Sequence, residues 1–306
     1  MKALVTGGAG FIGSHLAERL VRDGYDVTVL DNLSTGRREN LSDPSVLVQA
    51  DVRDRARLPE IFDRIRPEVV FHLAAQMNVR RSIADPIEDA DVNILGSLNV
   101  FRSAARSGVR RVIFASSGGA VYGEQSRYPC YETDVPAPVS PYGIAKLSVE
   151  HYGRYFADRA GLEFTALRIA NVYGPRQYPA GEAGVVALFL DELQKGRSPI
   201  IFGDGGQTRD FVWVGDVVEA FVLAMAGPPG IYNVGTATET SIVDLFRCLT
   251  QVVGFAPPPR HVASVGGEVR RNAVSFTRAQ GLLGWTPSVS LARGLERTAA
   301  RPRASA

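Results

Sequence analysis

The N-terminal part of the chain alternates short apolar runs with amphipathic stretches, and this alternation restricts the fold more than any other feature. The apolar runs are KALVT, DVTVL, VLVQA, VVFHLA and VIFAS. Between them lie helix-like stretches such as SHLAERLVRDG, in which Leu16, Leu20 and Val21 share one face before Gly24. Strands that alternate with helices form a parallel sheet covered on both faces. The sequence therefore predicts an α/β fold with a doubly wound parallel sheet.

The second part of the chain has a different sequence pattern. From Asn171 onward, turn-forming residues cluster in YGPRQYPAGEAG, AGPPG and FAPPPR. DFVWVGDVVEAFVLAMA is expected to return to the sheet as a strand and a helix. We predict a dinucleotide-binding domain of residues 1–170, to which 207–228 return, and a smaller C-terminal substrate-binding lobe of residues 171–206 and 229–306.

The stretch GGAGFIG follows the first apolar run and opens a helix. Gly7 allows the tight turn, Gly10 lets the backbone approach a pyrophosphate, and Gly13 lets helix and strand pack closely. The helix N-terminus offers unpaired N–H groups to phosphates. Asp31 ends the second strand, where a carboxylate accepts hydrogen bonds from ribose and repels a 2′-phosphate, so NAD is favoured over NADP. Arg37 and Arg38 weaken that preference, and the structural alternative is a glycine turn that only packs.

Two further strand ends agree with a bound dinucleotide. Asp51 and Val52 end the third strand, where an acid could hydrogen-bond the adenine amino group. HLAAQ ends the fourth strand with small residues, and ligands of parallel sheets bind at such carboxyl ends. The predicted cofactor site therefore comprises Gly7, Gly10, Phe11, Ile12, Gly13, Asp31, Asn32, Asp51, Val52, Leu73, Ala74, Ala75, Gln76, Asn93, Tyr142 and Lys146.

Tyr142 and Lys146 are spaced to lie one turn apart on one face of a helix. A nearby ammonium group favours phenolate and so lowers the pKa of a tyrosine. Such a tyrosine can act as general base on a sugar hydroxyl. Without the dinucleotide motif GGAGFIG earlier in the chain, Tyr142 and Lys146 would be better interpreted as surface residues that have this spacing by chance.

Composition excludes several classes of protein. The chain has 306 residues, 45% of them hydrophobic, and its 34 basic and 32 acidic residues are interspersed. The sequence has no long basic stripe, so a nucleic-acid or membrane partner is not supported. No apolar run is long enough for a membrane span. The two cysteines and four histidines do not have the spacing of metal ligands. With no cleavable leader apparent in MKALVTGG, we expect a cytoplasmic protein without a metal.

The motifs GGAGFIG, HLAAQ, SSGGAVYG, YGIAK and RIANVYGPRQ, in this order, resemble those of the extended short-chain dehydrogenases/reductases. The chain is most similar to the UDP-glucose (UDP-galactose) 4-epimerase group, and the similarity extends through GDGGQTRDFVWVGDV and GLLGWTP. The resemblance implies a Rossmann domain, tightly held NAD and a UDP-sugar substrate. It also implies a homodimer formed through residues around 89–106 and 142–158.

One catalytic position departs from that family. The family's third hydroxyl, a Ser or Thr, lies three residues before the Val of VYG, where this chain has Gly118. Because alternate strand residues share a face, Ser116 is the first candidate to replace it, Ser117 the second and a water molecule the third. The acids that the 4,6-dehydratases and decarboxylases of the family carry just before VYG are replaced by Gly119 and Ala120. Epimerisation by transient oxidation at carbon 4 is therefore the leading hypothesis.

The resemblance also implies a substrate site. Asn171 and Arg209 are expected at the UDP diphosphate and ribose, although each has a plain structural interpretation. GEAGVV, which includes Val185 and Val186, is expected at the uracil. Val265 replaces a phosphate-binding Arg of the relatives, for which Arg270 or Arg271 could compensate. The predicted substrate site comprises Gly118, Asn171, Val185, Val186, Arg209, Arg270 and Asn272.

Substrate choice is the least constrained part of the prediction. Asn272 stands where a bulky Tyr of the family rejects 2-acetamido sugars, so UDP-GlcNAc is expected as a substrate besides UDP-glucose. UDP-glucuronate is an alternative, since Arg80, Arg81 and Arg176 could reach a carboxylate. The competing functions are a nucleotide-sugar reductase or dehydratase and a protein that binds NAD without chemistry.

Overall fold

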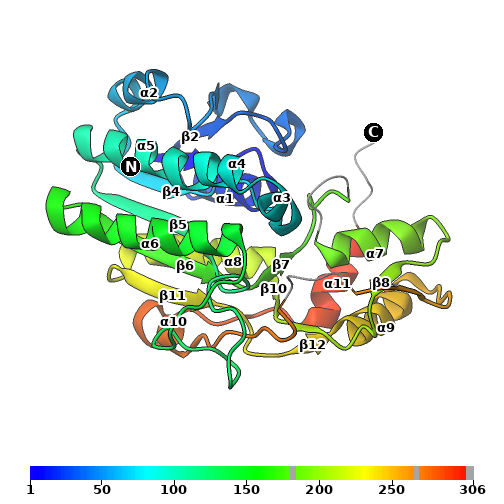
Figure 1. The fold of residues 1–306 in the computed structure, drawn as a ribbon. Helices are drawn as coiled ribbons and strands as arrows, with labels where there is room; N and C mark the ends of the chain where they lie inside the picture. Colours follow the sequence, from blue (N-terminus) through cyan, green and yellow to red (C-terminus); the bar gives the residue numbers. More distant parts are fainter. Residues whose placement is uncertain (180–183, 265–268, 301–306) are drawn as a thin grey trace.

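The computed structural model describes residues 1–179, 184–264 and 269–300. Its centre is a seven-stranded sheet in the order β3-β2-β1-β4-β5-β6-β11 (Figure 1), and all neighbouring strands are parallel. The strands are β1 (Lys2–Thr6), β2 (Asp26–Asp31), β3 (Leu47–Gln49), β4 (Val69–His72), β5 (Arg111–Ser117), β6 (Glu163–Ile169) and β11 (Gly230–Val234). The predicted doubly wound α/β fold is confirmed.

Helices cover both faces of this sheet because its strands are apolar on both sides. One face packs against α1 (Phe11–Arg22) and α8 (Val214–Ala226), and the other against α2 (Arg57–Ile65), α5 (Gly96–Arg106) and α6 (Pro141–Ala160). Three short segments lead into α5: α3 (Val79–Ala84), α4 (Pro86–Ala90) and the π-helical turn η3 (Asp91–Leu95). Two 3₁₀ turns, η1 (Arg38–Asn40) and η2 (Pro44–Val46), connect β2 to β3.

The smaller lobe lies beside the sheet domain, on the right in Figure 1, and has its own apolar core. Its helices are α7 (Val185–Gln194), α9 (Ile242–Val253) and α11 (Leu291–Ala299). Three two-stranded pairs complete this half of the chain: β7 (Asn171–Tyr173) with β10 (Phe211–Trp213), β8 (Ile200–Phe202) with β13 (Arg260–Val262), and β9 (Thr208–Arg209) with β12 (Thr240–Ser241).

The domain boundaries differ from the predicted ones at two places. Strand β11 pairs with β6 and closes the main sheet, although residues 230–234 were assigned to the smaller lobe. Helix α10 (Thr277–Leu283), also predicted for the smaller lobe, packs against α8 and β11. The sequence did not predict this strand because GIYNV is short and begins at the last residue of the turn-forming stretch AGPPG. No helix formed by the described residues is both long and apolar enough to cross a membrane.

Candidate active site

The glycine turn between β1 and α1 leaves no space for side chains. Gly7 has φ +69°, and a Cβ atom on it would lie 2.7 Å from the backbone nitrogen of Ala74. A Cβ atom on Gly13 would lie 2.2 Å from the carbonyl oxygen of Gly7. The chain therefore needs glycine here to bring the first turn of α1, with Phe11 and Ile12, against the sheet edge. The N-cap residue Gly10 has no side chain to cap the first turn of α1, whose N–H groups are therefore suited to a pyrophosphate.

Asp31 occupies the end of β2, and its carboxylate is fixed by the backbone. Its Oδ2 accepts a hydrogen bond from Ala9 N at 2.9 Å and its Oδ1 from Leu33 N at 2.8 Å. Burial raises the pKa of this carboxyl group. The nearby Arg37 guanidinium stacks 3.7 Å from the ring centre of Tyr178, and Arg38 donates to Gln49. With both arginines in other contacts, the carboxylate at the ribose position favours NAD.

Asp51 lies at the neighbouring strand end with both of its oxygens in hydrogen bonds. Asn32 Nδ2 donates to Asp51 Oδ2 at 2.9 Å, and the Arg53 guanidinium donates to both oxygens. Arg53 holds the pKa of Asp51 well below its usual range. The adjacent Val52 is buried. The structure thus places Asn32 and Asp51 together, at the edge where adenine binding was predicted.

The HLAAQ strand end is held by a reciprocal amide contact. Gln76 N donates to Asn93 Oδ1 at 2.9 Å, and Asn93 Nδ2 donates back to Gln76 O at 2.8 Å. Gln76 and Asn93 are buried, whereas Leu73, Ala74 and Ala75 are partly accessible along the sheet edge. These two hydrogen bonds therefore join the segment after β4 to η3.

Helix α6 begins where the candidate base is needed. Ser140 caps it by accepting a hydrogen bond from Gly143 N at 3.2 Å, and Pro141 supplies the first helical residue. A Cβ atom on Gly143 would lie 2.6 Å from the carbonyl oxygen of Ala120. Glycine at this position lets α6 approach the segment after β5, which sets Tyr142 beside it.

Lys146 is buried one turn further along α6. Its Nζ donates to the carbonyl oxygen of Ala115 at 2.8 Å and lies 5.6 Å from the ring centre of Tyr142. Burial lowers the pKa of Lys146 to about 8, while Asp89 and Glu150 act in the opposite direction. The structure therefore brings together the predicted tyrosine and a lysine whose charge depends on nearby carboxylates.

The two adjacent serines of SSGGAVYG have different surroundings. Ser116 is 4% exposed, and its hydroxyl donates to Glu150 Oε1 at 2.6 Å, within a buried ion pair of Glu150 and Arg168. This contact argues against Ser116 as the replacement hydroxyl. Ser117 Oγ instead lies 3.7 Å from the Cβ position of Gly119. A Cβ atom on Gly118 would lie 2.9 Å from Val274 Cγ1, so neighbouring packing accounts for the glycine there.

Comparison with known proteins places this geometry in a family. Residues 3–235 match the model of the NAD dependent epimerase/dehydratase family. The chain belongs to this family. It is 47% identical to the UDP-glucose 4-epimerase of Mycolicibacterium smegmatis, over 97% of each chain.

Solved structures agree with this assignment. A UDP-glucose 4-epimerase from Thermotoga maritima with UDP-glucose has a TM-score of 0.96 and 46% identity, covering 98% of this chain and 97% of that one. The Thermus thermophilus UDP-glucose 4-epimerase in complex with NAD has a TM-score of 0.93 and 41% identity, covering 98% of each chain. Other solved relatives are named UDP-N-acetylglucosamine and UDP-glucuronic acid 4-epimerases.

Three predictions are thereby confirmed: the epimerase/dehydratase family, NAD as cofactor, and a sugar-nucleotide epimerase as the class of enzyme. The glycine turn and the fixed carboxylate of Asp31 fit NAD, and they would hold its pyrophosphate and adenosine ribose. Among the described residues, no cluster of three or more His, Cys, Asp or Glu side chains could hold a metal ion.

At the substrate end, two asparagines meet the segment after β5. Asn272 is 1% exposed, and its Nδ2 donates to the carbonyl oxygen of Gly118 at 3.0 Å. Asn171 Oδ1 lies 3.6 Å from the Cβ position of Gly119. The Oδ1 atoms of both asparagines are buried without a hydrogen-bond partner among the described residues. Two buried acceptors thus border the place where Ser117 lies.

The other predicted substrate residues differ in their contacts and in how deeply they are buried. Arg209 donates to Thr208 O, whereas the Arg270 guanidinium pairs with Asp204 in an exposed, two-pronged salt bridge. Val185 is half-buried at the start of α7, but Val186 is 1% exposed and belongs to the core of the smaller lobe. A residue buried in that core is a poor candidate for substrate contact. Gly181 to Ala183 and Val265 lie outside the described residues.

Two residues that the sequence did not predict have notable contacts: Phe202, which meets the sheet domain, and Asp89 on α4. Phe202 ends β8 half-exposed, and the Arg80 guanidinium of the sheet domain lies 4.7 Å from its ring centre. Its only sequence signal is that it directly precedes GDGGQTRD, which indicates no ligand by itself. Asp89, buried on α4, had no sequence signal because it is one acid within an acidic stretch, PIEDAD.

Proposed function

We propose that the protein is a UDP-sugar 4-epimerase that interconverts UDP-glucose and UDP-galactose, and also UDP-GlcNAc and UDP-GalNAc. The observation that carries this proposal is the Tyr142–Lys146 pair beside the NAD cradle, with Gly119 and Ala120 where related enzymes carry additional acids. A single base, Tyr142, is sufficient for oxidation and reduction at carbon 4 of the sugar, without an additional acidic residue. Dehydration or decarboxylation would need groups that this stretch does not supply.

The chain's residues would move one proton in each direction. Tyr142, as phenolate, takes the proton of the sugar's 4-hydroxyl, and the Lys146 ammonium stabilises the phenolate charge. NAD, which the glycine turn and Asp31 would hold, would supply the hydride acceptor and donor for carbon 4. Tyr142 then returns its proton to the oxygen, so the reaction has no net redox change.

Ser117 is the hydroxyl that we assign to share the substrate oxygen with Tyr142. Ser116 is engaged with Glu150, while Ser117 borders the open Cβ position of Gly119. A water molecule against Gly119 remains the competing donor, and the Ser117→Ala variant described below distinguishes the two.

The smaller lobe supplies the substrate contacts. Asn171 and Arg209 suit the UDP diphosphate and ribose, and Phe202 offers a flat ring for uracil. Room for a 2-acetamido group follows from Asn272, which is smaller than tyrosine and is held by Gly118 O. Glucuronate is less well supported, because Arg81 pairs with Glu88 and Arg176 with Glu18.

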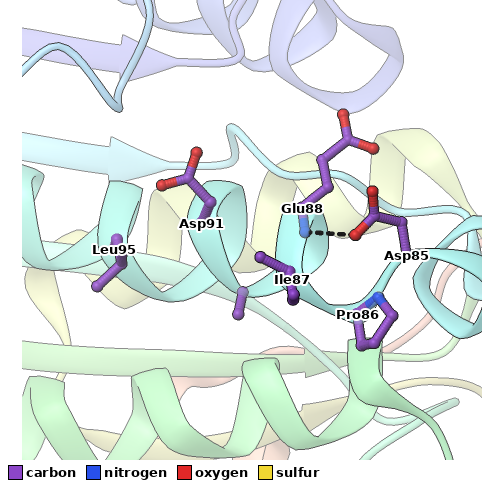
Figure 2. Close-up of a pocket in the computed structure, with 7 residues that line it drawn as sticks. Asp85, Pro86, Ile87, Glu88, Asp91 and Leu95 are labelled. Atoms are coloured by element: carbon purple, nitrogen blue, oxygen red, sulfur yellow. Dashed lines mark hydrogen bonds between the residues drawn. The ribbon is translucent and has the colours of Figure 1, made fainter.

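We also propose a homodimer through the outer faces of α4, η3, α5 and α6. A surface pocket of about 700 Å³ lies along this region and is lined by residues that include Ile87 and Leu95 (Figure 2). Ile87 is 81% exposed, and Ile144 and Tyr155 on α6 are 51% and 57% exposed. Such apolar side chains on adjoining helices suit burial against a second copy.

The test is a panel of UDP-sugars incubated with purified protein to which no NAD is added. We expect epimers of UDP-glucose and UDP-GlcNAc, and none from the Tyr142→Phe variant, which should still copurify with NAD. Conversion of UDP-glucuronate alone would replace the proposed substrate, and an inert UDP-GlcNAc would refute the role given to Asn272. Turnover by Tyr142→Phe at the wild-type rate would eliminate Tyr142 as the base.

A further inference from the structure

Asp89 is a buried carboxylate behind the active site that the proposed reaction does not use. It is 1% exposed, and its Oδ1 accepts hydrogen bonds from Gln76 Nε2 and Asn93 Nδ2, both at 2.9 Å. Its Oδ2 is buried without a hydrogen-bond partner among the described residues. A buried acceptor left without a donor is costly unless a charge nearby compensates it.

Lys146 is the nearby charge. Helix α4, which carries Asp89, packs against α6, and Asp89 is the first of the two carboxylates that stabilise the charged form of Lys146. The second, Glu150, is already neutralised by Arg168, whose guanidinium binds both of its oxygens. From β4, His72 faces Lys146, and burial keeps this histidine neutral by lowering its pKa to about 3.

The ionisable groups around Lys146 therefore have different roles. Glu150 belongs to an internal ion pair, His72 contributes no charge near neutral pH, and Tyr142 is the reacting group. Asp89 has no arginine or lysine hydrogen-bonded to its carboxylate among the described contacts. It is also the group that orients Gln76 and Asn93, which would border NAD.

We propose that Asp89 is a positioning residue that acts as the counter-ion of Lys146 and keeps this buried lysine protonated for catalysis. The inference rests on the proposed function for its catalytic consequence only. Asp89 touches neither substrate nor reacting atoms, and it acts through Lys146. A carboxylate here offsets the burial that lowers the pKa of the ammonium group, while burial raises the pKa of Asp89 and Lys146 counteracts that rise.

The sequence offers an unusually direct test, because Lys2, Lys146 and Lys195 are its only lysines. Protein labelled with ¹³C at lysine Cε gives three signals, and the exposed Lys2 and Lys195 serve as internal references. We expect the Asp89→Asn variant to lower the pKa of Lys146 by about one unit or more, the usual effect of losing a close opposite charge. Asn keeps an oxygen that can accept from Gln76 and Asn93.

Glu88→Gln is the matched control, since it removes the neighbouring carboxylate, which is paired with Arg81 on the surface. It should leave the Lys146 titration unchanged. Equal titration of Lys146 in wild type and Asp89→Asn would overturn the proposal, as would an equal shift in Glu88→Gln. Should Asp89→Asn not fold, the Lys146 signal of the His72→Gln variant, which has no imidazole beside Lys146, must still show a second inflection at acidic pH as Asp89 takes up a proton. Its absence would count against the proposal.

Activity gives the second readout. In Asp89→Asn, kcat should fall about tenfold or more near neutral pH, and the alkaline limb of its pH profile should move to lower pH. The expected change in KM is small, because Asp89 does not contact substrate. If the protein is not an epimerase, the NMR experiment still tests the Lys146 counter-ion. Failure of the proposed function and failure of this inference are therefore distinguishable.

Discussion

At the scale of single residues, the two adjacent serines of SSGGAVYG have different environments. Ser116 lies in a buried network with Glu150, Arg168 and Tyr122, in which Arg168 Nη1 donates to Tyr122 Oη at 2.9 Å. Ser117 is only partly buried and borders the segment that faces Tyr142. Ser116 thus supports the fold, and Ser117 is the serine that we propose for contact with substrate.

Alanine substitutions should separate these roles. Ser117→Ala removes a hydrogen bond to the reacting oxygen, so kcat should fall by about one to two orders of magnitude with stability unchanged. Ser116→Ala leaves a buried carboxylate with one donor fewer, so unfolding free energy should fall by about 1–3 kcal/mol with kcat retained. Urea unfolding and initial rates measure both quantities. The reverse pattern would restore Ser116 as the catalytic hydroxyl.

At the scale of elements, a buried polar chain joins two strands to the helix that follows them. His72 at the end of β4 contacts Thr6 Oγ1 of β1 at 2.7 Å through Nδ1, and Ser97 Oγ of α5 at 2.9 Å through Nε2. Ser97 donates its own proton to Asn93 O, so His72 Nε2 must be the donor toward Ser97. The chain therefore needs neutral His72 to hold the sheet edge that carries Gln76.

This arrangement predicts a pH dependence of stability. Burial lowers the pKa of His72 from 6.5 to about 3, so between these values the unfolded state binds the extra proton. The stabilisation is complete above pH 6.5 and is lost by about 1.4 kcal/mol per pH unit as the pH falls toward 3. The His72→Gln variant should reduce this slope, whereas His151→Gln, at an exposed position of α6, should not. Equal slopes for wild type and His72→Gln would contradict the assignment.

Several features could be predicted from the sequence because they depend on neighbours along the chain. The glycine turn, the carboxylate of Asp31 and the helical spacing of Tyr142 and Lys146 all belong to this class. The side chain of Ser116 could not be placed, because Glu150, its partner, comes from a helix far along the chain. The pairing of Arg270 with Asp204 and the counter-ion position of Asp89 likewise depend on how separate elements pack.

At the scale of the whole molecule, helices α4 and α6 carry the exposed apolar side chains that we assign to a dimer. Helix α6 connects the two functions, since its inner face carries Lys146 and its outer face carries Ile144 and Tyr155. Figure 2 shows Ile87 and Leu95 along the same helical segment, which lies beside α6. Dimer formation would therefore support the helix that holds the catalytic pair.

Charge placed in this face should produce monomers. We expect a dimer for the wild type in sedimentation velocity, and a monomer for the Ile87→Arg, Tyr155→Arg double variant, because two arginines cannot be buried unpaired. Val135→Arg is the control, since Val135 is 78% exposed in the segment between β5 and α6. A monomeric wild type, or a double variant that remains dimeric, would refute this interface.

The proposed reaction requires that hydride leave carbon 4 and return to it within one active site. The most direct measurement is conversion of UDP-galactose in deuterated water by purified protein without added NAD, followed by NMR. We predict UDP-glucose with ordinary hydrogen retained at carbon 4 and no deuterium elsewhere on the ring. Deuterium at carbon 4 or carbon 5, or the absence of UDP-glucose, would contradict the account.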